Sequence, residues 1–461
     1  MRKLQNLLNY WTVSVSFEEI KKTFLLAVPI GIGQLGHVLT GIADYTMLGH
    51  HSSLEMAATT FATSVFFPIM ILGMGISIGL TPIVAKANGA KDTSKINKLF
   101  STGLKLNTII GLLLLLILLF FGENLSIFNQ DPDVIDGCAV YFAIISISII
   151  PIMISQSFKQ FIDALQDTVT PMYISLFCNL INIILNFFLI FGFGGFPELG
   201  IVGAAISTLV SRSLMVVIFC LYFYYKTKFR SLLVNTFKTR MDFVLAKAIL
   251  GIGLPISVYM FFEVAAFSAA TFMVGWISKD HMSAHQIALS LASMSFVLAM
   301  GIGHAGSIMT ATYLGEKRLD KIKGVAISVT IITLSLSFVT ALIFLIFKNK
   351  LPLIFVPEIE ELIITQAASM LVLAAIFQFS DGLQVVFQGL LQGVGDVKVP
   401  SFIAVFSYWI IGLPLGYWYA FYNGMSAQGV WIGLAIGLTF SAVLQILRYR
   451  YVLKQLLLVE K

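Results

Sequence analysis

Charged residues are scarce in this chain of 461 residues, where Asp, Glu, Lys and Arg together make up 11%. Soluble domains carry about 25%, so the composition excludes a soluble globular protein. Cysteine is also scarce, and Cys138, Cys178 and Cys220 are too few and too scattered for a disulfide framework or a metal cluster. Hydrophobic residues account for 58% of the chain and the mean hydropathy is +0.92, which indicates a membrane protein.

Motifs for hydrolysis and nucleotide binding are also missing. The sequence contains neither an HExxH zinc motif nor a phosphate-binding P-loop. Membrane-embedded metalloprotease activity and ATP-driven pumping therefore lack support. We expect no enzymatic activity and no bound cofactor.

Twelve apolar segments are each long enough to cross a bilayer, for which about 20 residues suffice. They cover residues 24–48, 57–85, 98–121, 138–160, 170–192, 200–225, 247–275, 283–311, 323–347, 363–390, 399–420 and 428–450. The sequence thus predicts an all-α membrane protein with twelve transmembrane helices.

Basic residues are distributed unevenly between the two ends of these segments. Of the 29 Lys and Arg residues, 25 lie toward the side of the N-terminus, Lys279, Lys348 and Lys350 lie toward the other, and Arg212 falls within a span. Because cytoplasmic loops carry the excess of Lys and Arg, we expect both termini in the cytoplasm and a multi-pass protein of the inner membrane. Contact with anionic lipid headgroups explains the net charge of +6, and no nucleic-acid partner is expected.

The two halves of the chain repeat one another. Six matches hold two nearly equal offsets of 226 and 229 residues: Pro29 with Pro255, Met74-Gly75-Ile76 with Met300-Gly301-Ile302, Gly89 with Gly315, Asp167 with Asp396, Pro171 with Pro400, and Gly200 with Gly429. Each half holds an even number of spans, so the repeats enter the membrane in the same direction. Such parallel repeats are known in transporters that alternate access.

The repeat predicts five segments. A cytoplasmic N-terminal segment covers 1–23, an N-lobe of six spans covers 24–225, and a basic linker covers 226–246. A C-lobe of six spans covers 247–450, and a cytoplasmic tail covers 451–461. The two lobes are expected to form two six-helix bundles, with the substrate site between them.

Three acids lie within apolar spans: Asp44, Glu263 and Asp381. A carboxylate within a membrane is expensive unless it faces protein, water or a cation, so it marks a functional site by default. Arg212 alone cannot neutralise three carboxylates. Carboxylate, amide and hydroxyl oxygens are the ligands that hard cations prefer, so the acids point to a proton or a metal cation.

Polar residues recur at helical spacing in three spans. Those of the fourth approach the cytoplasmic edge, where water can solvate them: Gln156, Lys159, Gln160, Asp163 and Asp167. Asn179, Asn182 and Asn186 share one face of the fifth span, and the tenth span presents Gln378, Asp381, Gln384 and Gln388 within one arc. These faces line a cavity or hold helices together by hydrogen bonds, and the acids favour the cavity. His285 begins the eighth span; we count it as a cavity candidate, although packing is the more common role of such a histidine.

Several separated segments together resemble one family, the multidrug and toxic compound extrusion (MATE) transporters, and its NorM branch in particular. The resemblance covers roughly residues 24–450 and rests on Asp44 and on four segments: PELGIVGA (197–204), FEV (262–264), AHQIAL (284–289) and DGLQ (381–384). It implies secondary antiport, in which organic cations and amphiphilic drugs leave the cell against an inward flow of Na⁺ or H⁺.

The resemblance also implies which residues couple transport to the cation. Carried over by motif, the N-lobe site consists of Asp44, Asn182, Asn186 and Thr208, and the C-lobe site consists of Glu263 and Asp381. Some members have an aspartate where this chain has Asn186, so the N-lobe site here has one acid fewer. Na⁺ would bind at Asp44 or at Glu263 and Asp381, and the protein is expected to act as a monomer.

Two other readings compete with an exporter. A lipid-linked precursor flippase of the same wider superfamily would handle anionic headgroups and would line its cavity with Arg or Lys, whereas this chain supplies acids. A channel or a membrane receptor would not require acids in both repeats, whereas a transporter that alternates access would explain them. Counted from the predicted helix ends at about 1.5 Å per residue, Glu263 and Asp381 lie at different depths, and only the resemblance brings them together.

Overall fold

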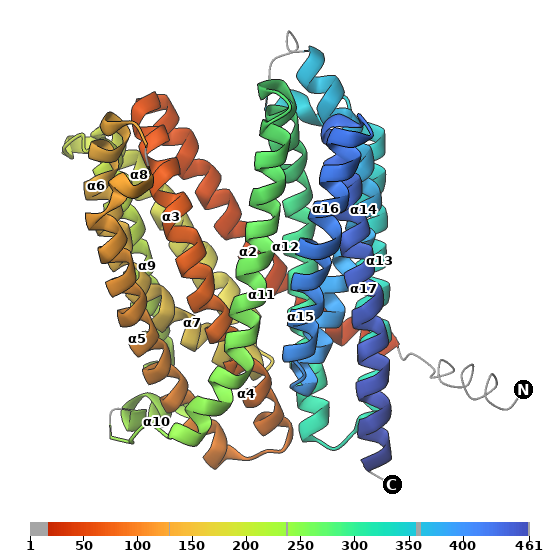
Figure 1. Ribbon diagram of the computed structural model, residues 1–461. Coiled ribbons are helices and arrows are strands. Elements are labelled where there is room, and N and C mark those ends of the chain that lie inside the picture. Colours follow the sequence, from red (N-terminus) through yellow and green to blue (C-terminus); the bar gives the residue numbers. More distant parts are fainter. Residues whose placement is uncertain (1–16, 129, 237, 356–360, 460–461) are drawn as a thin grey trace, which may run out of the picture. The chain divides into compact units, whose positions relative to one another are not determined.

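The computed structural model describes residues 17–128, 130–236, 238–355 and 361–459. Within these ranges the chain forms helices and no β-strand (Figure 1). Most of the predicted N-terminal segment, residue 237 of the linker and residues 460–461 of the tail lie outside the described residues.

The twelve predicted spans are confirmed over the described ranges, and most helices run several residues past the predicted ends. The first repeat contains α2 (Phe17–His51), α3 (Ser53–Ile78), α4 (Leu80–Gly89), α5 (Thr93–Glu123), α6 (Pro132–Ile147), α7 (Ile149–Ala164), α8 (Val169–Phe191) and α9 (Gly200–Tyr225). The second contains α11 (Phe243–Gly275), α12 (Lys279–Gly315), α13 (Leu319–Phe347), α14 (Glu361–Val394), α15 (Lys398–Phe406), α16 (Leu413–Tyr417) and α17 (Ser426–Val459). α3 with α4, α6 with α7, and α15 with α16 each make up one span.

Local sequence determines several helix starts. Ser52 precedes α3, and its side chain accepts a hydrogen bond from the Glu55 amide; Asp92 does the same for α5 from Lys95. Such caps satisfy backbone donors that have no partner within the helix. Apolar side chains on all faces then stabilise helices that meet both protein and lipid.

The helices pack into two compact units that exchange one segment each. Unit 1 contains residues 17–31 and 262–459, and unit 2 contains residues 32–261. The first part of α2 therefore packs with the second repeat, and the first part of α11 packs with the first repeat. These units differ at both segments from the six-plus-six lobes expected from the sequence, and those lobes stay a prediction as functional bodies.

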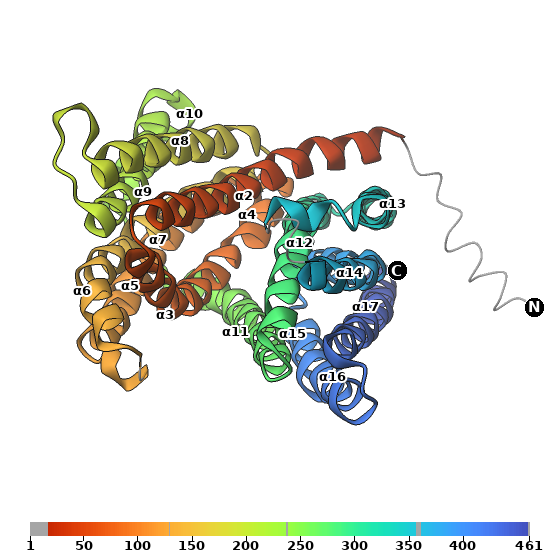
Figure 2. The same ribbon diagram turned by 90° about the horizontal axis from the view of Figure 1, so that it is seen from above.

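In unit 1, α14 packs against α12, α13 and α17 (Figures 1 and 2). Glycines allow the backbones to approach closely: a Cβ atom on Gly389 would lie 2.1 Å from the Gly303 carbonyl oxygen, and one on Gly433 would lie 2.2 Å from the Gly416 amide nitrogen. Lipid is as apolar as the helix surfaces, so helices in a membrane associate largely through van der Waals packing, and small residues at the crossings allow that close packing.

The eleventh span is irregular. Between α15 and α16 the backbone forms a π-helical segment, η4 (Ser407–Gly412), and a second one, η5 (Trp418–Tyr422), follows α16. π-Helical turns are rare and occur frequently at functional sites. Here the first of them carries Tyr408, which is almost fully buried.

Unit 2 contains an aromatic core and a structured linker. Phe100, Phe158 and Phe223 stack or meet edge to face, with ring centroids 4.9–5.5 Å apart. The predicted linker contains a helix, α10 (Thr227–Thr236), which packs against α5 and α9. After it, the Thr239 hydroxyl lies 2.7 Å from that of Ser101, so this part of the linker is fixed to α5.

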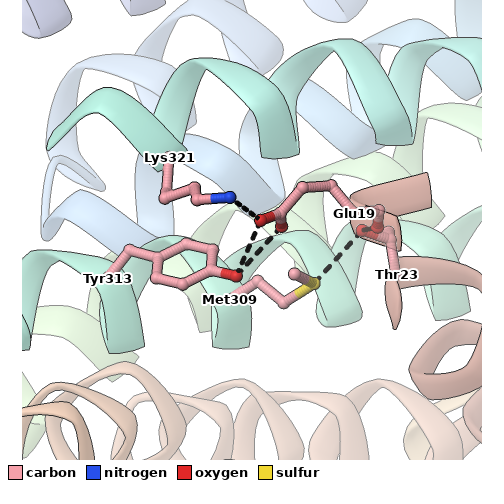
Figure 3. A network of polar contacts seen from close by, with 5 residues as sticks. All are labelled: Glu19, Thr23, Met309, Tyr313 and Lys321. Carbon is pink, nitrogen blue, oxygen red and sulfur yellow. Dashed lines mark hydrogen bonds and ion pairs between the residues drawn. The ribbon is translucent and has the colours of Figure 1, made fainter. Parts of the chain in front are cut away.

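A polar cluster anchors the start of α2 within unit 1 (Figure 3). The Glu19 carboxylate accepts hydrogen bonds from Lys321 at 2.7 Å and from the Tyr313 hydroxyl at 2.9 Å. One turn later, the Thr23 hydroxyl lies 3.1 Å from the Met309 sulfur. Lys321 belongs to α13 and the other two partners to α12, so the cluster ties three helices together.

Candidate functional site

The Asp44 site (Asp44, Asn182, Asn186 and Thr208) lies within unit 2, and three helices supply it. Asp44 is half-buried on α2, two turns before that helix ends. The Asn186 amide, on α8, donates a hydrogen bond to Asp44 Oδ1. The structure thus brings the first-span acid directly against the polar stripe of the fifth span.

Asn182 and Thr208 complete this network. Asn182 is buried one turn before Asn186 and lies 3.5 Å from the Thr208 hydroxyl on α9. In the orientation that satisfies both ends of its amide, Asn182 donates to Asp44 Oδ1 at 3.1 Å and accepts from the Thr208 backbone N–H at 3.3 Å. The Asp44 carboxylate then receives two amide donors, an arrangement that stabilises a negative charge.

A basic residue lies beside this network. Arg212 follows Thr208 by one turn of α9, and the charges of Arg212 and Asp44 are close enough to interact. Arg212 Nη1 donates to the Ser148 hydroxyl at 2.6 Å, and the guanidinium lies 5.5 Å from the centre of the Phe66 ring. Its position in the span was evident from the sequence, but these partners were not.

The Glu263 site (Glu263, Asp381, Gln384 and Tyr408) lies within unit 1 and joins α11, α14 and the first π-helical segment. The Tyr408 hydroxyl lies 2.7 Å from Glu263 Oε1 and 2.7 Å from Gln384 Oε1. Gln384 Nε2 donates to Glu263 at 3.4 Å. Trp409, the next residue, donates to the Phe262 carbonyl at 3.0 Å and so fixes the π-helical segment against α11.

Asp381 lies one turn before Gln384 on the same helix, and its charge interacts with that of Glu263. The two carboxylates, whose depths differed in the sequence estimate, therefore belong to one site. Asp381 is 5% exposed, and its Oδ1 has no hydrogen-bond partner among the residues that the structure describes. It borders a cavity of about 10 Å³ that Ser295, Ser337 and Gln378 also line, roughly the room that one water molecule needs.

The other predicted cavity residues are mostly engaged in hydrogen bonds between helices. Gln378 donates to the Ser337 carbonyl at 3.2 Å and also lines the small cavity, while Gln388 accepts from Gln445 at 3.0 Å. Asn179 is half-buried, and its amide nitrogen has no partner within the described part of the chain. Their role as the lining of a substrate cavity stays a prediction.

His285 is fully buried, and both ring nitrogens are engaged. Trp431 donates to Nδ1 at 3.1 Å, so Nε2 carries the hydrogen and donates to the Thr271 hydroxyl at 3.0 Å. A neutral imidazole with two partners is typical of a packing histidine. These contacts favour packing over the cavity role expected for His285 from the sequence.

Tyr408 is the residue of the Glu263 site that the sequence did not reveal. A lone tyrosine in an apolar span forms no polar stripe, and its burial depends on a π-helical turn that no spacing predicts. Among residues 17–128, 130–236, 238–355 and 361–459, no three His, Cys, Asp or Glu side chains come together as a metal centre. A cation at either site would therefore be held by one or two carboxylates with neutral oxygens.

Twelve apolar helices, an internal repeat, and carboxylates within the spans of both units define a membrane transporter. The MatE family model matches the chain twice, at residues 29–188 and 255–418; the two matches begin 226 residues apart, the offset of the repeat. This chain belongs to the MatE family. Its members are transporters, so it is not an enzyme.

Curated relatives match over nearly their whole length. The probable multidrug resistance protein NorM of Xylella fastidiosa is 32% identical over 438 residues, which cover 94% of this chain and 92% of that protein. The multidrug resistance protein MdtK of Pectobacterium atrosepticum is 31% identical and covers 95% and 96%. The probable NorM of Bacillus anthracis is 32% identical and covers 94% and 95%.

Solved structures share the fold. The eukaryotic MATE transporter AtDTX14 superimposes with a TM-score of 0.82 at 23% identity, covering 95% of this chain and 98% of that one. A MATE family transporter of the MOP superfamily in an outward-facing conformation gives a TM-score of 0.87 at 19% identity, with coverage of 95% and 96%.

Proposed function

We propose that this protein is a cation-coupled antiporter that exports organic cations and amphiphilic drugs by alternating access between two lobes. The observation that carries the proposal is the presence of carboxylates within the helical spans of each unit: the half-buried Asp44 in unit 2, and the buried Glu263 and Asp381 in unit 1. The names of the NorM and MdtK relatives support multidrug substrates. The coupling ion is Na⁺ or H⁺.

The contacts of Tyr408 support a site that exchanges a positive charge. One hydroxyl hydrogen serves only one acceptor, yet the Tyr408 oxygen lies 2.7 Å from an oxygen of Glu263 and 2.7 Å from an oxygen of Gln384. A proton on Glu263, or a cation that the oxygens share, would satisfy the second short contact. Loss of that charge would leave the oxygens facing one another, so occupancy changes how α11, α14 and the eleventh span attract each other.

At the Asp44 site, the hydrogen bonds of two asparagines depend on the charge of the carboxylate. Asn182 and Asn186 orient the carboxylate through their amides. Neutralisation of Asp44 weakens those hydrogen bonds, because a charged acceptor binds roughly twice as strongly as a neutral one. The contact between α2 and α8 therefore depends on the charge of Asp44, which gives the ion a means to drive a change of conformation.

The predicted setting is the inner membrane, with both termini in the cytoplasm. The distribution of the 25 Lys and Arg residues supports this orientation. The partners are small drug molecules and the surrounding lipids, with the protein acting as a monomer and without a nucleic-acid partner.

The test is efflux of a fluorescent organic cation from proteoliposomes under an imposed Na⁺ or pH gradient. The proposal expects energised efflux for the natural protein and its loss in Asp44→Asn. Asp133→Asn is the matched control, because Asp133 is an exposed acid in the first turn of α6.

Two outcomes would change the reading. Unchanged efflux in Asp44→Asn would make Asp44 structural and move coupling to Glu263 and Asp381. No efflux by the natural protein under either gradient would favour the lipid-linked precursor flippase.

A further inference from the structure

Arg212 is held within unit 2 by two side-chain contacts from other elements. It lies on α9 between Thr208 and the end of that helix. Ser148, at the break between α6 and α7, accepts from Nη1 at 2.6 Å while its own hydroxyl donates to the Ile145 carbonyl. Phe66 of α3 offers its ring face to the guanidinium. A guanidinium held in this way cannot leave the site without breaking both contacts.

The fixed charge lies within electrostatic range of the network around Asp44. Arg212 is one turn from Thr208, which contacts Asn182, and Asn182 and Asn186 both approach the Asp44 carboxylate. The charges of Arg212 and Asp44 interact, with Tyr141 within range of both. Since arginine stays protonated in proteins, one positive charge is permanently present within electrostatic range of this carboxylate.

We propose that Arg212 is a specificity-determining residue whose tethered charge takes the place of a metal cation beside Asp44 and excludes Na⁺ from the Asp44 site. One carboxylate with one guanidinium has no net charge to attract a further cation, and a metal ion there would meet a like charge. The amides add to this effect, because they direct N–H groups and not oxygens at Asp44, whereas Na⁺ requires oxygen ligands.

The Glu263 site differs in charge. Glu263 and Asp381 place two carboxylates within interaction range of each other, and hydroxyl and amide oxygens surround them. Na⁺ binding is therefore expected to belong to the Glu263 site. This assignment rests on the proposed cation coupling and adds to it which unit takes the metal ion.

Removal of the guanidinium leaves a group suited to a cation. Asn186 Oδ1 is buried and has no hydrogen-bond partner within the ranges that the structure describes. Together with an uncompensated Asp44 carboxylate it offers the oxygens that Na⁺ needs. Arg212→Gln should therefore create a Na⁺ site that depends on Asp44.

The experiment measures Na⁺ binding to the purified full chain by calorimetry, which needs no transport. The starting variant combines Glu263→Gln with Asp381→Asn, which removes both acids of the Glu263 site. With Arg212 intact this variant should bind no Na⁺. Adding Arg212→Gln should create Na⁺ binding, with an affinity at least about tenfold above any residual binding of the starting variant, since a like charge within interaction range disfavours a cation by that much or more. Adding Asp44→Asn should then abolish it, while Arg212→Lys in place of Arg212→Gln should behave like arginine.

The outcomes separate the inference from the proposed function. Asp44-dependent Na⁺ binding while Arg212 is still present overturns the inference, and so does no gain of binding in a folded Arg212→Gln variant. If Arg212→Gln does not fold, the variant that retains Arg212 still tests the inference, because Asp44-dependent Na⁺ binding to it would overturn the proposed exclusion. A merely structural arginine would change stability without creating a Na⁺ site. Failure of drug efflux would refute the exporter and leave these binding results unaffected.

Discussion

Gly75 of α3 packs directly against Ser257 of α11: a Cβ atom on Gly75 would lie 2.5 Å from the Ser257 Cα. The same contact recurs in unit 1, where a Cβ atom on Gly301 would lie 2.8 Å from the Gly31 amide nitrogen. Gly301 is the repeat partner of Gly75, and Ser257 is that of Gly31, both at the offset of 226 residues. The internal repeat is thus expressed as a pair of equivalent helix crossings.

Enlarging the residue at this crossing should destabilise the protein. Gly75→Ala must push the Ser257 backbone away, and such overpacking typically costs about 1–3 kcal/mol. Gly251→Ala is the matched control in α11, because a Cβ atom there meets nothing within 4 Å; it should be neutral or slightly stabilising. Thermal unfolding in detergent measures both, and equal stability of the two variants would contradict this packing.

Tyr408→Phe should weaken cation coupling without unfolding the protein. The substitution removes the hydroxyl between Glu263 and Gln384 and keeps the ring. In the occupied site the hydroxyl oxygen would share the bound proton or cation with Glu263 and Gln384; because such a contact contributes about 0.5–1.5 kcal/mol, the Na⁺ or H⁺ concentration for half-maximal efflux should rise by about 2- to 10-fold. Tyr417→Phe, at a half-exposed tyrosine of α16, is the control. An unchanged cation requirement would remove Tyr408 from the site.

Glu19 and Lys321 should be energetically coupled. Their ion pair of 2.7 Å is partly buried and shares its carboxylate with Tyr313 (Figure 3). A double-mutant cycle of Glu19→Gln and Lys321→Met, followed by chemical unfolding in detergent, should give an interaction energy of about 0.5–3 kcal/mol. Additive effects would show that the start of α2 is anchored by packing alone.

His285→Gln should lower stability and leave ion coupling intact. The change disturbs hydrogen bonds with Trp431 and Thr271, and an unsatisfied buried donor costs about 1–3 kcal/mol. Trp431→Phe should lower stability for the same reason. For both variants, efflux per folded molecule should keep its natural dependence on Na⁺ and pH. A changed dependence would assign His285 to the transport pathway after all.

The sequence predicted the helices and the polar face of the fifth span for clear physical reasons. Twelve spans follow from hydropathy, and Asn182 and Asn186 share a face because they are one turn apart. That this face meets Asp44, and that Thr208 belongs with it, came from the family resemblance. The serine partner of Arg212 could not be named, since Ser148 is one of several hydroxyls in its span and is selected by a break in the helix.

The Glu263 site was harder to predict because the position of a helix end does not show how deep a residue lies in the membrane. α11 and α14 contain 33 and 34 residues, or about 50 Å at 1.5 Å per residue, which exceeds a hydrocarbon core of about 30 Å. Counting from predicted ends therefore misplaced Glu263 relative to Asp381. The exchange of helix segments between the units was also invisible, since each span was read by itself.

The exchanged segments also bear on how the chain could have arisen and how it can be divided. Residues 17–31 complete the unit of the second repeat, and residues 243–261 complete that of the first, so neither repeat encodes a whole unit. Two copies of a single-repeat ancestor could have built the same units only by exchanging the first parts of their first helices, as in a domain-swapped dimer. Gene fusion would make that trade permanent, and a protein split near residue 240 should regain its structure only when both fragments are made together.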